Sequence, residues 1–178
     1  MSQYICVDIG GTSIKHGVLD ENAIIKECNQ TKTEAWLGGA AVLDKVKTIG
    51  KQYKEQYENI EGICISTAGM VDPEEGKIVF AGELMPGYTG TCIKKELEKA
   101  LEMPCEVEND VNCAGLAEYV SGSAKESHIM FCATVGTGIG GCAIVNGRVF
   151  HGASNSACEV GYIPMGDSDF QTLGASSI

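Results

Sequence analysis

Two short glycine-rich segments, far apart in the sequence, have the composition of phosphate-binding turns. Each follows a run typical of a β-strand; the segments are Asp8-Ile9-Gly10-Gly11-Thr12 and Gly136-Thr137-Gly138-Ile139-Gly140-Gly141. Because glycine has no Cβ, the backbone N–H groups of such a turn can approach a phosphate closely. One such turn is weak support for a site, but two with the same layout suggest a duplicated lobe that holds one nucleotide from two sides.

The first turn matches neither of the common nucleotide-binding motifs. It leads into a second strand-like run, Ile14 to Leu19, where the dinucleotide-binding fingerprint requires a helix. The sequence contains no Gly-Lys-Ser or Gly-Lys-Thr, which the P-loop requires. An ordinary hairpin turn is the alternative for Gly10 and Gly11, since glycine is common in turns.

The composition is that of an acidic, globular chain. Of the 178 residues 44% are hydrophobic, which is too many for a disordered chain, and the formal net charge is −11. Because no basic patch offsets this charge, we expect neither nucleic acid nor an anionic membrane as a partner. No apolar run approaches the length of a transmembrane helix.

The nine cysteines are scattered and have no metal-binding spacing. None forms a Cys-x-x-Cys pair and no histidine lies nearby at ligand spacing, so a zinc site is not expected. Several lie in apolar runs, where cysteine acts as a small hydrophobe. An odd count without a signal peptide indicates a reducing cytoplasm.

The elements that must position the two turns are strands interspersed with helices. Strands are predicted over residues 3–8, 13–20, 22–28, 62–66, 77–80 and 128–135. Helices are predicted around residues 43–57, 93–101 and 109–119, the second with Thr91 as a possible cap. Asn146-Gly147 between two apolar runs predicts a hairpin with a type I′ turn.

The pattern of strand, glycine turn and strand begins again after residue 125, which divides the chain into lobes 1–122 and 123–178. The second lobe has no predicted helices to cover its sheet, and a bare face would leave apolar surface in water. We therefore expect a piece of a longer chain or one half of an obligate homodimer.

Four motifs occur in the order seen in the ROK family of sugar kinases, which the chain resembles over nearly all its length. They are the two glycine-rich turns, the segment from Glu108 to Glu118, and Ala157-Cys158-Glu159-Val160-Gly161-Tyr162; Pro86-Gly87-Tyr88 is similar to a Pro-Gly-Trp segment of the family. The resemblance implies an α/β protein with the actin-like ATPase (ribonuclease H-like) fold, with a complete first lobe and the beginning of the second. It also implies transfer of a phosphoryl group from ATP to a sugar hydroxyl, usually O6.

For the first lobe, the resemblance implies a nucleotide and sugar site. The turn residues Gly10, Gly11 and Thr12 would lie near the terminal phosphates, and Asp8 would orient Mg²⁺ through water, because Mg²⁺ keeps several of its waters. Lys15 either counters phosphate charge or is a solvated strand residue. The resemblance also implies that Gly69 and Asn109 belong to the sugar site.

For the rest of the chain, the resemblance makes Asp110 the general base. The partial positive charge of a helix N-terminus favours an ionised aspartate, which can accept the proton of the sugar hydroxyl; a plain N-cap is the alternative. Glu159, flanked by small and apolar residues, is costly to bury unless it meets donors, which suggests contact with a sugar hydroxyl or else a cap or ion pair. Gly136, Thr137 and Gly138 would hold phosphate from the second lobe.

Two departures from the family pattern stand out. Tyr162 replaces a histidine that in the family both contacts sugar and binds structural zinc, and residues 165–174 contain none of the cysteines that complete that zinc site. Their joint loss predicts a protein without zinc, in which Tyr162 offers a hydroxyl to the sugar or packs in place of the metal. Cys158 replaces a glycine of the family and is expected to narrow the backbone there.

The predicted function is that of a cytoplasmic, ATP- and Mg²⁺-dependent kinase of glucose, a related hexose or a β-glucoside. The alternatives are a ROK-type sugar-responsive transcriptional regulator, which the charge of −11 disfavours, and a non-catalytic sugar-binding protein. The identity of the sugar is left open, because specificity depends on a few hydroxyl contacts and on loop shape.

Overall fold

The computed structural model describes residues 1–136, 138–165 and 168–169. The chain divides into two compact units, Met1–Asn109 and Asp110–Ile178. The helix that follows residue 109 therefore belongs to the second unit, whereas the sequence places the boundary after it, at residue 122.

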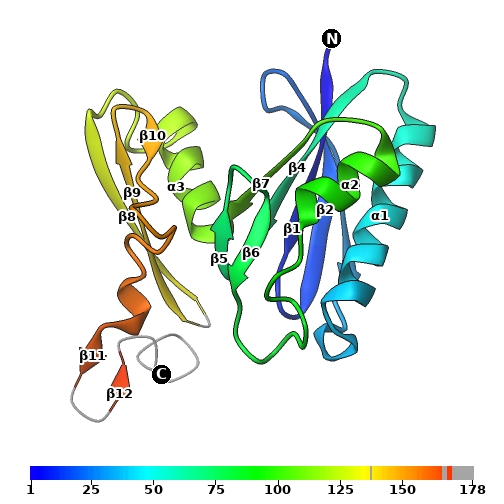
Figure 1. The fold of residues 1–178 in the computed structure, drawn as a ribbon. Helices are drawn as coiled ribbons and strands as arrows, with labels where there is room; N and C mark the ends of the chain where they lie inside the picture. Colours follow the sequence, from blue (N-terminus) through cyan, green and yellow to red (C-terminus); the bar gives the residue numbers. More distant parts are fainter. Residues whose placement is uncertain (137, 166–167, 170–178) are drawn as a thin grey trace. The chain divides into compact units, whose positions relative to one another are not determined.

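The first unit is built on a sheet of five strands. These are β1 (Gln3–Ile9), β2 (Ser13–Asp20), β3 (Ile25–Lys32), β4 (Ile60–Thr67) and β7 (Cys105–Asn109), in the order β3-β2-β1-β4-β7 (Figure 1). The first three strands pair antiparallel, and β1, β4 and β7 run parallel. The carboxyl ends of these three parallel strands therefore meet at one edge of the sheet, where ligands of α/β sheets commonly bind.

Two helices cover one face of this sheet, α1 (Gly39–Gln56) and α2 (Ile93–Leu101). Alternate residues of β1 are buried beneath them, as the two-residue period of a strand predicts. Leu97 is fully buried on α2, and burial of such a side chain contributes about 1.5–3 kcal/mol to stability. Gly50 of α1 allows the close approach of α2, because a Cβ there would lie 2.6 Å from a methyl carbon of Leu101.

A short hairpin, β5 (Met70–Asp72) and β6 (Lys77–Phe80), and a 3₁₀ helix, η1 (Ala35–Leu37), complete the first unit. The loop after β6 is anchored by Tyr88, which is buried and shares a 2.7 Å hydrogen bond with the Thr67 hydroxyl at the end of β4. Burial raises the pKa of Tyr88 to about 12, so the phenol stays protonated. The Pro86-Gly87-Tyr88 segment is therefore held against the edge where the parallel strands end.

The second unit consists of helix α3 (Asp110–Ser121) against a small sheet. Strands β8 (Ile129–Val135), β9 (Ile139–Val145) and β10 (Arg148–Val149) form an antiparallel sheet, followed by η2 (Val160–Tyr162) and the pair β11 (Pro164–Met165) and β12 (Ser168–Asp169). Gly115 lets α3 lie close to the sheet, since a Cβ there would lie 2.6 Å from the Cys142 sulfur.

Most of the predicted elements are confirmed, with shifted ends. The hairpin at Asn146-Gly147 has positive φ at both residues, 50° and 78°, as a type I′ turn requires. The expected Thr91 cap is wrong: Cys92 precedes α2 without a side-chain cap, and the Thr91 hydroxyl instead donates to the Gly87 carbonyl. Within the described residues, no helix combines the length and apolarity needed to cross a membrane.

Candidate active site

Asp8 lies at the end of β1 and is oriented by its neighbour on β4. The two strands pair Asp8 with Ser66, whose hydroxyl donates a 2.8 Å hydrogen bond to Asp8 Oδ1. On the other side, β2 pairs Asp8 with Lys15, whose Nζ lies 4.0 Å from Asp8 Oδ2. Both charged side chains are solvent-exposed, at 43% for Asp8 and 63% for Lys15, so this ion pair is worth little by itself. One oriented carboxylate with a hydroxyl beside it suits a cation that keeps its waters.

The first glycine-rich turn is held by a buried threonine that follows β3, beside the start of β2. The Thr33 hydroxyl donates a 2.6 Å hydrogen bond to the Gly10 carbonyl, and its N–H donates to the Thr12 carbonyl at 3.1 Å. Thr33 has no exposed surface, so both bonds are shielded from water. Gly11 and Thr12 remain exposed at the tip of this clamped turn.

Asn109 ends β7 and contacts Gly69. The amide Nδ2 of Asn109 donates a 2.9 Å hydrogen bond to the Gly69 carbonyl. Gly69 has a φ of 99°, and a Cβ there would lie 2.7 Å from the Phe80 carbonyl oxygen, so only glycine fits. The structure thus joins two predicted sugar-site residues that are forty positions apart in the sequence.

Asp110 begins α3, where its carboxylate Oδ1 accepts a 2.9 Å hydrogen bond from the N–H of Val111. The side chain is exposed and lies at the positive end of the helix. The next residue touches the second glycine-rich turn, since a Cβ on Gly140 would lie 2.4 Å from a Val111 methyl carbon. Glycine at position 140 therefore allows the start of α3 to approach β9.

The second glycine-rich turn joins β8 to β9, as predicted. Gly136 is exposed, and its N–H donates a 2.8 Å hydrogen bond to the Gly138 carbonyl. The expected phosphate role of Thr137 falls on a residue outside the described ones.

The segment that carries Glu159 packs against β9. A Cβ on Gly141 would lie 2.6 Å from the Cys158 carbonyl oxygen, so this glycine makes room for the segment. Burial and, secondarily, the negative charge of Asp110 raise the pKa of Glu159. Cys158 has a φ of 65°, a left-handed conformation that favours glycine, which explains why a glycine is expected here and marks the cysteine as strained. Tyr162 lies in η2 with 47% of its surface exposed.

The sequence model of the ROK family matches residues 4–174. The chain belongs to the ROK family. It is 50% identical over 177 residues to an uncharacterized protein of Clostridium perfringens, covering 99% of this chain and 60% of the relative. It is 33% identical to the beta-glucoside kinase of Listeria monocytogenes, covering 88% of this chain and 51% of that kinase. It is 31% identical to the glucokinase of Halalkalibacterium halodurans, and the match covers 90% of this chain and 49% of that glucokinase. The chain thus spans about half the length of these two kinases.

Solved structures of ROK proteins have the same fold. The ROK family glucokinase of Streptomyces griseus, solved in complex with glucose and AMPPNP, superposes with a TM-score of 0.82 at 30% identity, covering 93% of this chain and 51% of that one. The ROK hexokinase of Thermus thermophilus superposes with a TM-score of 0.80 at 28% identity, and the match covers 98% of this chain and 61% of that one. The predicted actin-like ATPase fold is therefore confirmed, and the chain corresponds to the N-terminal part of these ROK kinases.

Within this ROK chain the candidate residues form two groups, one in each unit. Asp8, Lys15, the turn at 10–12, Gly69 and Asn109 lie at the edge where the parallel strands of the first unit end. Asp110, the turn at 136–138 and Glu159 belong to the second unit, where electrostatic coupling joins Asp110 to Glu159.

The sequence did not predict two residues that hold members of the first group in place, Ser66 and Thr33. Ser66 follows an apolar run near the end of its strand, as Asp8 does. This shared position could have identified Ser66 from the sequence. Thr33 carries no such signal, because its role depends on a contact 23 residues away in sequence with the Gly10 carbonyl.

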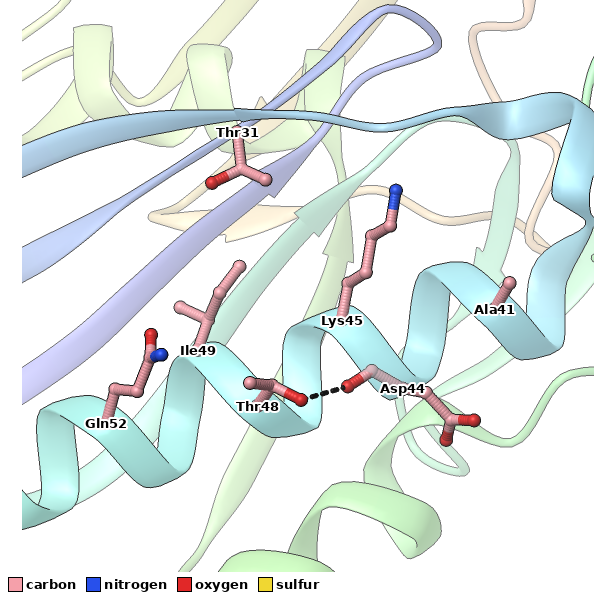
Figure 2. A pocket seen from close by; sticks show the side chains of 7 residues that line it. All are labelled: Thr31, Ala41, Asp44, Lys45, Thr48, Ile49 and Gln52. Carbon is pink, nitrogen blue, oxygen red and sulfur yellow. Dashed lines mark hydrogen bonds between the residues drawn. The ribbon is translucent and has the colours of Figure 1, made fainter.

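A pocket elsewhere in the first unit does not coincide with this site. It lies between β3 and α1 and is lined by Thr31, Ala41, Asp44, Lys45, Thr48, Ile49 and Gln52 (Figure 2). Lys45 is already engaged by the carbonyls of Lys32 and Thr33 and by the Glu34 carboxylate. None of the predicted site residues that the structure describes lines this pocket.

Proposed function

We propose that the protein transfers a phosphoryl group from ATP to a sugar hydroxyl, most directly O6 of glucose, a related hexose or a β-glucoside. The observation that carries this proposal is the Asn109–Asp110 junction. The Asn109 amide is fixed on the Gly69 carbonyl, and the following carboxylate begins a helix. Relatives named glucokinase and beta-glucoside kinase, and a neighbour solved with glucose and AMPPNP, support this substrate class.

In this proposal Asp110 accepts the proton of the attacking sugar hydroxyl. A base at a helix start stays ionised, and it needs only to lie within hydrogen-bond reach of the hydroxyl. Asn109, Gly69, Glu159 and Tyr162 hold the sugar. Because ionised Glu159 is disfavoured by burial and by the charge of Asp110, donation from sugar hydroxyls would offset that cost.

The residues at the ends of β1 and β4 fit Mg²⁺ and nucleotide phosphates. When bound, Mg²⁺ neutralises the charge that develops on the phosphates. Asp8, oriented by Ser66, would hold a water of the ion, and Lys15 would add positive charge near the phosphates. Gly10, Gly11 and Thr12 from the first turn, and Gly136, Thr137 and Gly138 from the second, would bind the phosphates.

We also propose that the protein works in the cytoplasm, as a possible homodimer, without zinc. The motivation for the last point is sequence alone: Tyr162 stands in place of the family's histidine and the cysteine motif is missing. Within the part of the chain that the structure describes, no three His, Cys, Asp or Glu side chains cluster as metal ligands. Metal analysis of the purified protein should find no stoichiometric zinc, and a chelator should leave the melting temperature unchanged once Mg²⁺ is restored; one equivalent of zinc contradicts the proposal.

The deciding experiment is a panel of sugars with the full-length protein. Glucose, mannose, N-acetylated hexosamines and β-glucosides are each incubated with ATP and Mg²⁺, and ADP release is coupled to an optical readout. Phosphorylation of at least one sugar, at O6 by NMR of the product, is the expected result. Sugar binding without turnover would instead identify a non-catalytic binding protein.

A further inference from the structure

Two cysteines face each other across neighbouring strands of the first unit. The parallel pairing of β1 and β4 places Cys6 directly opposite Cys64. Because side chains alternate along a strand, each cysteine lies on the same face as the residue two positions on, which is Asp8 for Cys6 and Ser66 for Cys64. Directly opposed side chains on these strands lie within contact distance, since Ser66 and Asp8 are joined by a 2.8 Å hydrogen bond.

The two thiols interact, and one of them is accessible. Cys64 is exposed and Cys6 is half-buried. A hydrogen bond with Cys6 lowers the pKa of Cys64 to about 7. Thiolate is the reactive form of cysteine, so Cys64 is a nucleophile near neutral pH with a second thiol beside it.

The spacing of the strands permits a covalent link. Neighbouring strands lie about 4.7–4.9 Å apart. The Cα atoms of bonded cysteines are usually about 4.4–6.8 Å apart, so a directly opposed pair falls inside this window. Neither of the other two cysteines of this sheet has such a partner position, because Cys28 on β3 pairs with Gly17 and Cys105 on β7 pairs with Ile63.

We propose that Cys6 and Cys64 form an oxidation site that a hydroperoxide converts reversibly to a disulfide. The Cys64 thiolate attacks the peroxide oxygen, which breaks the O–O bond, gives the sulfenic acid of Cys64 and releases hydroxide or an alkoxide. The Cys6 sulfur then attacks the Cys64 sulfur and displaces the sulfenic oxygen as water. Overall two thiols and one hydroperoxide give one disulfide, water and an alcohol, or two waters when the oxidant is hydrogen peroxide. A dithiol reductant returns the disulfide to two thiols by exchange and is itself oxidised to a disulfide.

The test treats the full-length protein with hydrogen peroxide and maps disulfides by peptide mass spectrometry. The Cys6–Cys64 linked peptide is expected as the main product, and reduction should remove it. A matched measurement follows alkylation at pH 7, in which Cys64 should react about tenfold faster than exposed Cys28, the ratio that a lowered thiol pKa gives after its weaker nucleophilicity is allowed for.

Substitutions test whether the reactivity of Cys64 depends on its pairing with Cys6 or only on its exposure to solvent. Cys6→Ala should abolish the linked peptide, slow alkylation of Cys64 several-fold and leave a stable sulfenic acid that a dimedone probe captures on Cys64. Cys28→Ala, the control, should change none of these. Equal alkylation of Cys64 in the wild type and in Cys6→Ala, or oxidation that yields no Cys6–Cys64 peptide, overturns the proposal; neither readout requires kinase activity.

Discussion

The two units of this chain differ in how fully they bury their sheets. In the first, α1 and α2 cover a sheet face with a continuous core that includes fully buried Ile5 and Leu97. In the second, α3 covers one face of β8 and β9, while alternate residues on the opposite side of β8 are exposed: Ile129 at 72%, Phe131 at 57% and Val135 at 66%.

This difference bears on how each unit positions its own candidate residues. In the first unit, Asp8 and Asn109 lie near the ends of strands whose opposite face is packed. Each forms a hydrogen bond with a residue of another segment, Asp8 with Ser66 and Asn109 with Gly69. In the second, Asp110 and Glu159 depend on glycines at 140 and 141 that let α3 and the 158–160 segment approach β9. Core packing and hydrogen bonds therefore position the candidate residues of the first unit, whereas close approach of the backbone positions those of the second.

The largest expected effect separates the chemical roles of the two groups. Asp110→Asn keeps the shape of the side chain but cannot accept a proton, so turnover should fall by about 10²-fold or more. Asp8→Asn should instead raise the Mg²⁺ concentration needed for half-maximal rate, with a smaller effect on turnover at saturating Mg²⁺. Steady-state kinetics of the full-length protein over a range of Mg²⁺ concentrations measure both.

The matched control is Asp72→Asn, which alters an aspartate that only accepts backbone hydrogen bonds in the turn before β6. Its kinetics should resemble those of the wild type. If Asp110→Asn keeps near-full turnover, the general base has been assigned to the wrong residue.

The next effect tests the difference in burial itself. Leu97→Ala in the first unit should lower the free energy of unfolding by about 2–5 kcal/mol, because it leaves a cavity in a packed core. Phe131→Ala in the second unit should cost about 0.5 kcal/mol or less, since the ring is more than half exposed. Urea denaturation followed by circular dichroism measures both. A cost for Phe131→Ala as large as that for Leu97→Ala would break the comparison and show that this face of β8 is covered in the protein as tested.

Much of the fold was predictable because its signals are local. The apolar period of α1, the buried runs of β1 and β4, and the Asn146-Gly147 turn each depend on a few adjacent residues, and the structure confirms them. The order of the motifs predicted the family, which the match over residues 4–174 bears out.

What the sequence did not reveal depends on contacts between distant segments. The Thr33 hydroxyl meets the Gly10 carbonyl only because β3 returns beside the turn. Helix α3 packs against the sheet of the second unit through close contacts at Gly115 and Gly140, and these depend on residues of strands that lie far along the sequence. The individual roles of the site residues stay predictions, since they depend on ligands.

The smallest expected effect tests the electrostatics of the second unit, in which the pKa values of two glutamates are shifted in opposite directions. Burial, with the charge of Asp110 second, raises the pKa of Glu159, whereas hydrogen bonds from the Ser123 N–H and hydroxyl lower the pKa of Glu118. Both start from an ordinary value of 4.5. A raised pKa in the folded state means that folding binds the proton more tightly than the unfolded chain does, so stability is lost as pH rises through the folded pKa. A lowered pKa means the reverse: stability is present above the ordinary value and is lost as pH falls through the folded pKa.

Substitution by glutamine removes each ionisation and should therefore give opposite trends. Thermal melts between about pH 4 and pH 8 should show Glu159→Gln gaining stability relative to the wild type as pH rises, and Glu118→Gln losing it. Because the charge of Asp110 contributes to the shift, Asp110→Asn should also lower the pKa of Glu159, which ¹³C NMR of the labelled carboxyl carbon can follow directly. A pKa of Glu159 that does not respond to Asp110→Asn would mean that the two carboxylates do not interact. The proposal that Asp110 acts as the base beside Glu159 as a sugar contact would then have to be abandoned, even if Asp110 proves essential for turnover.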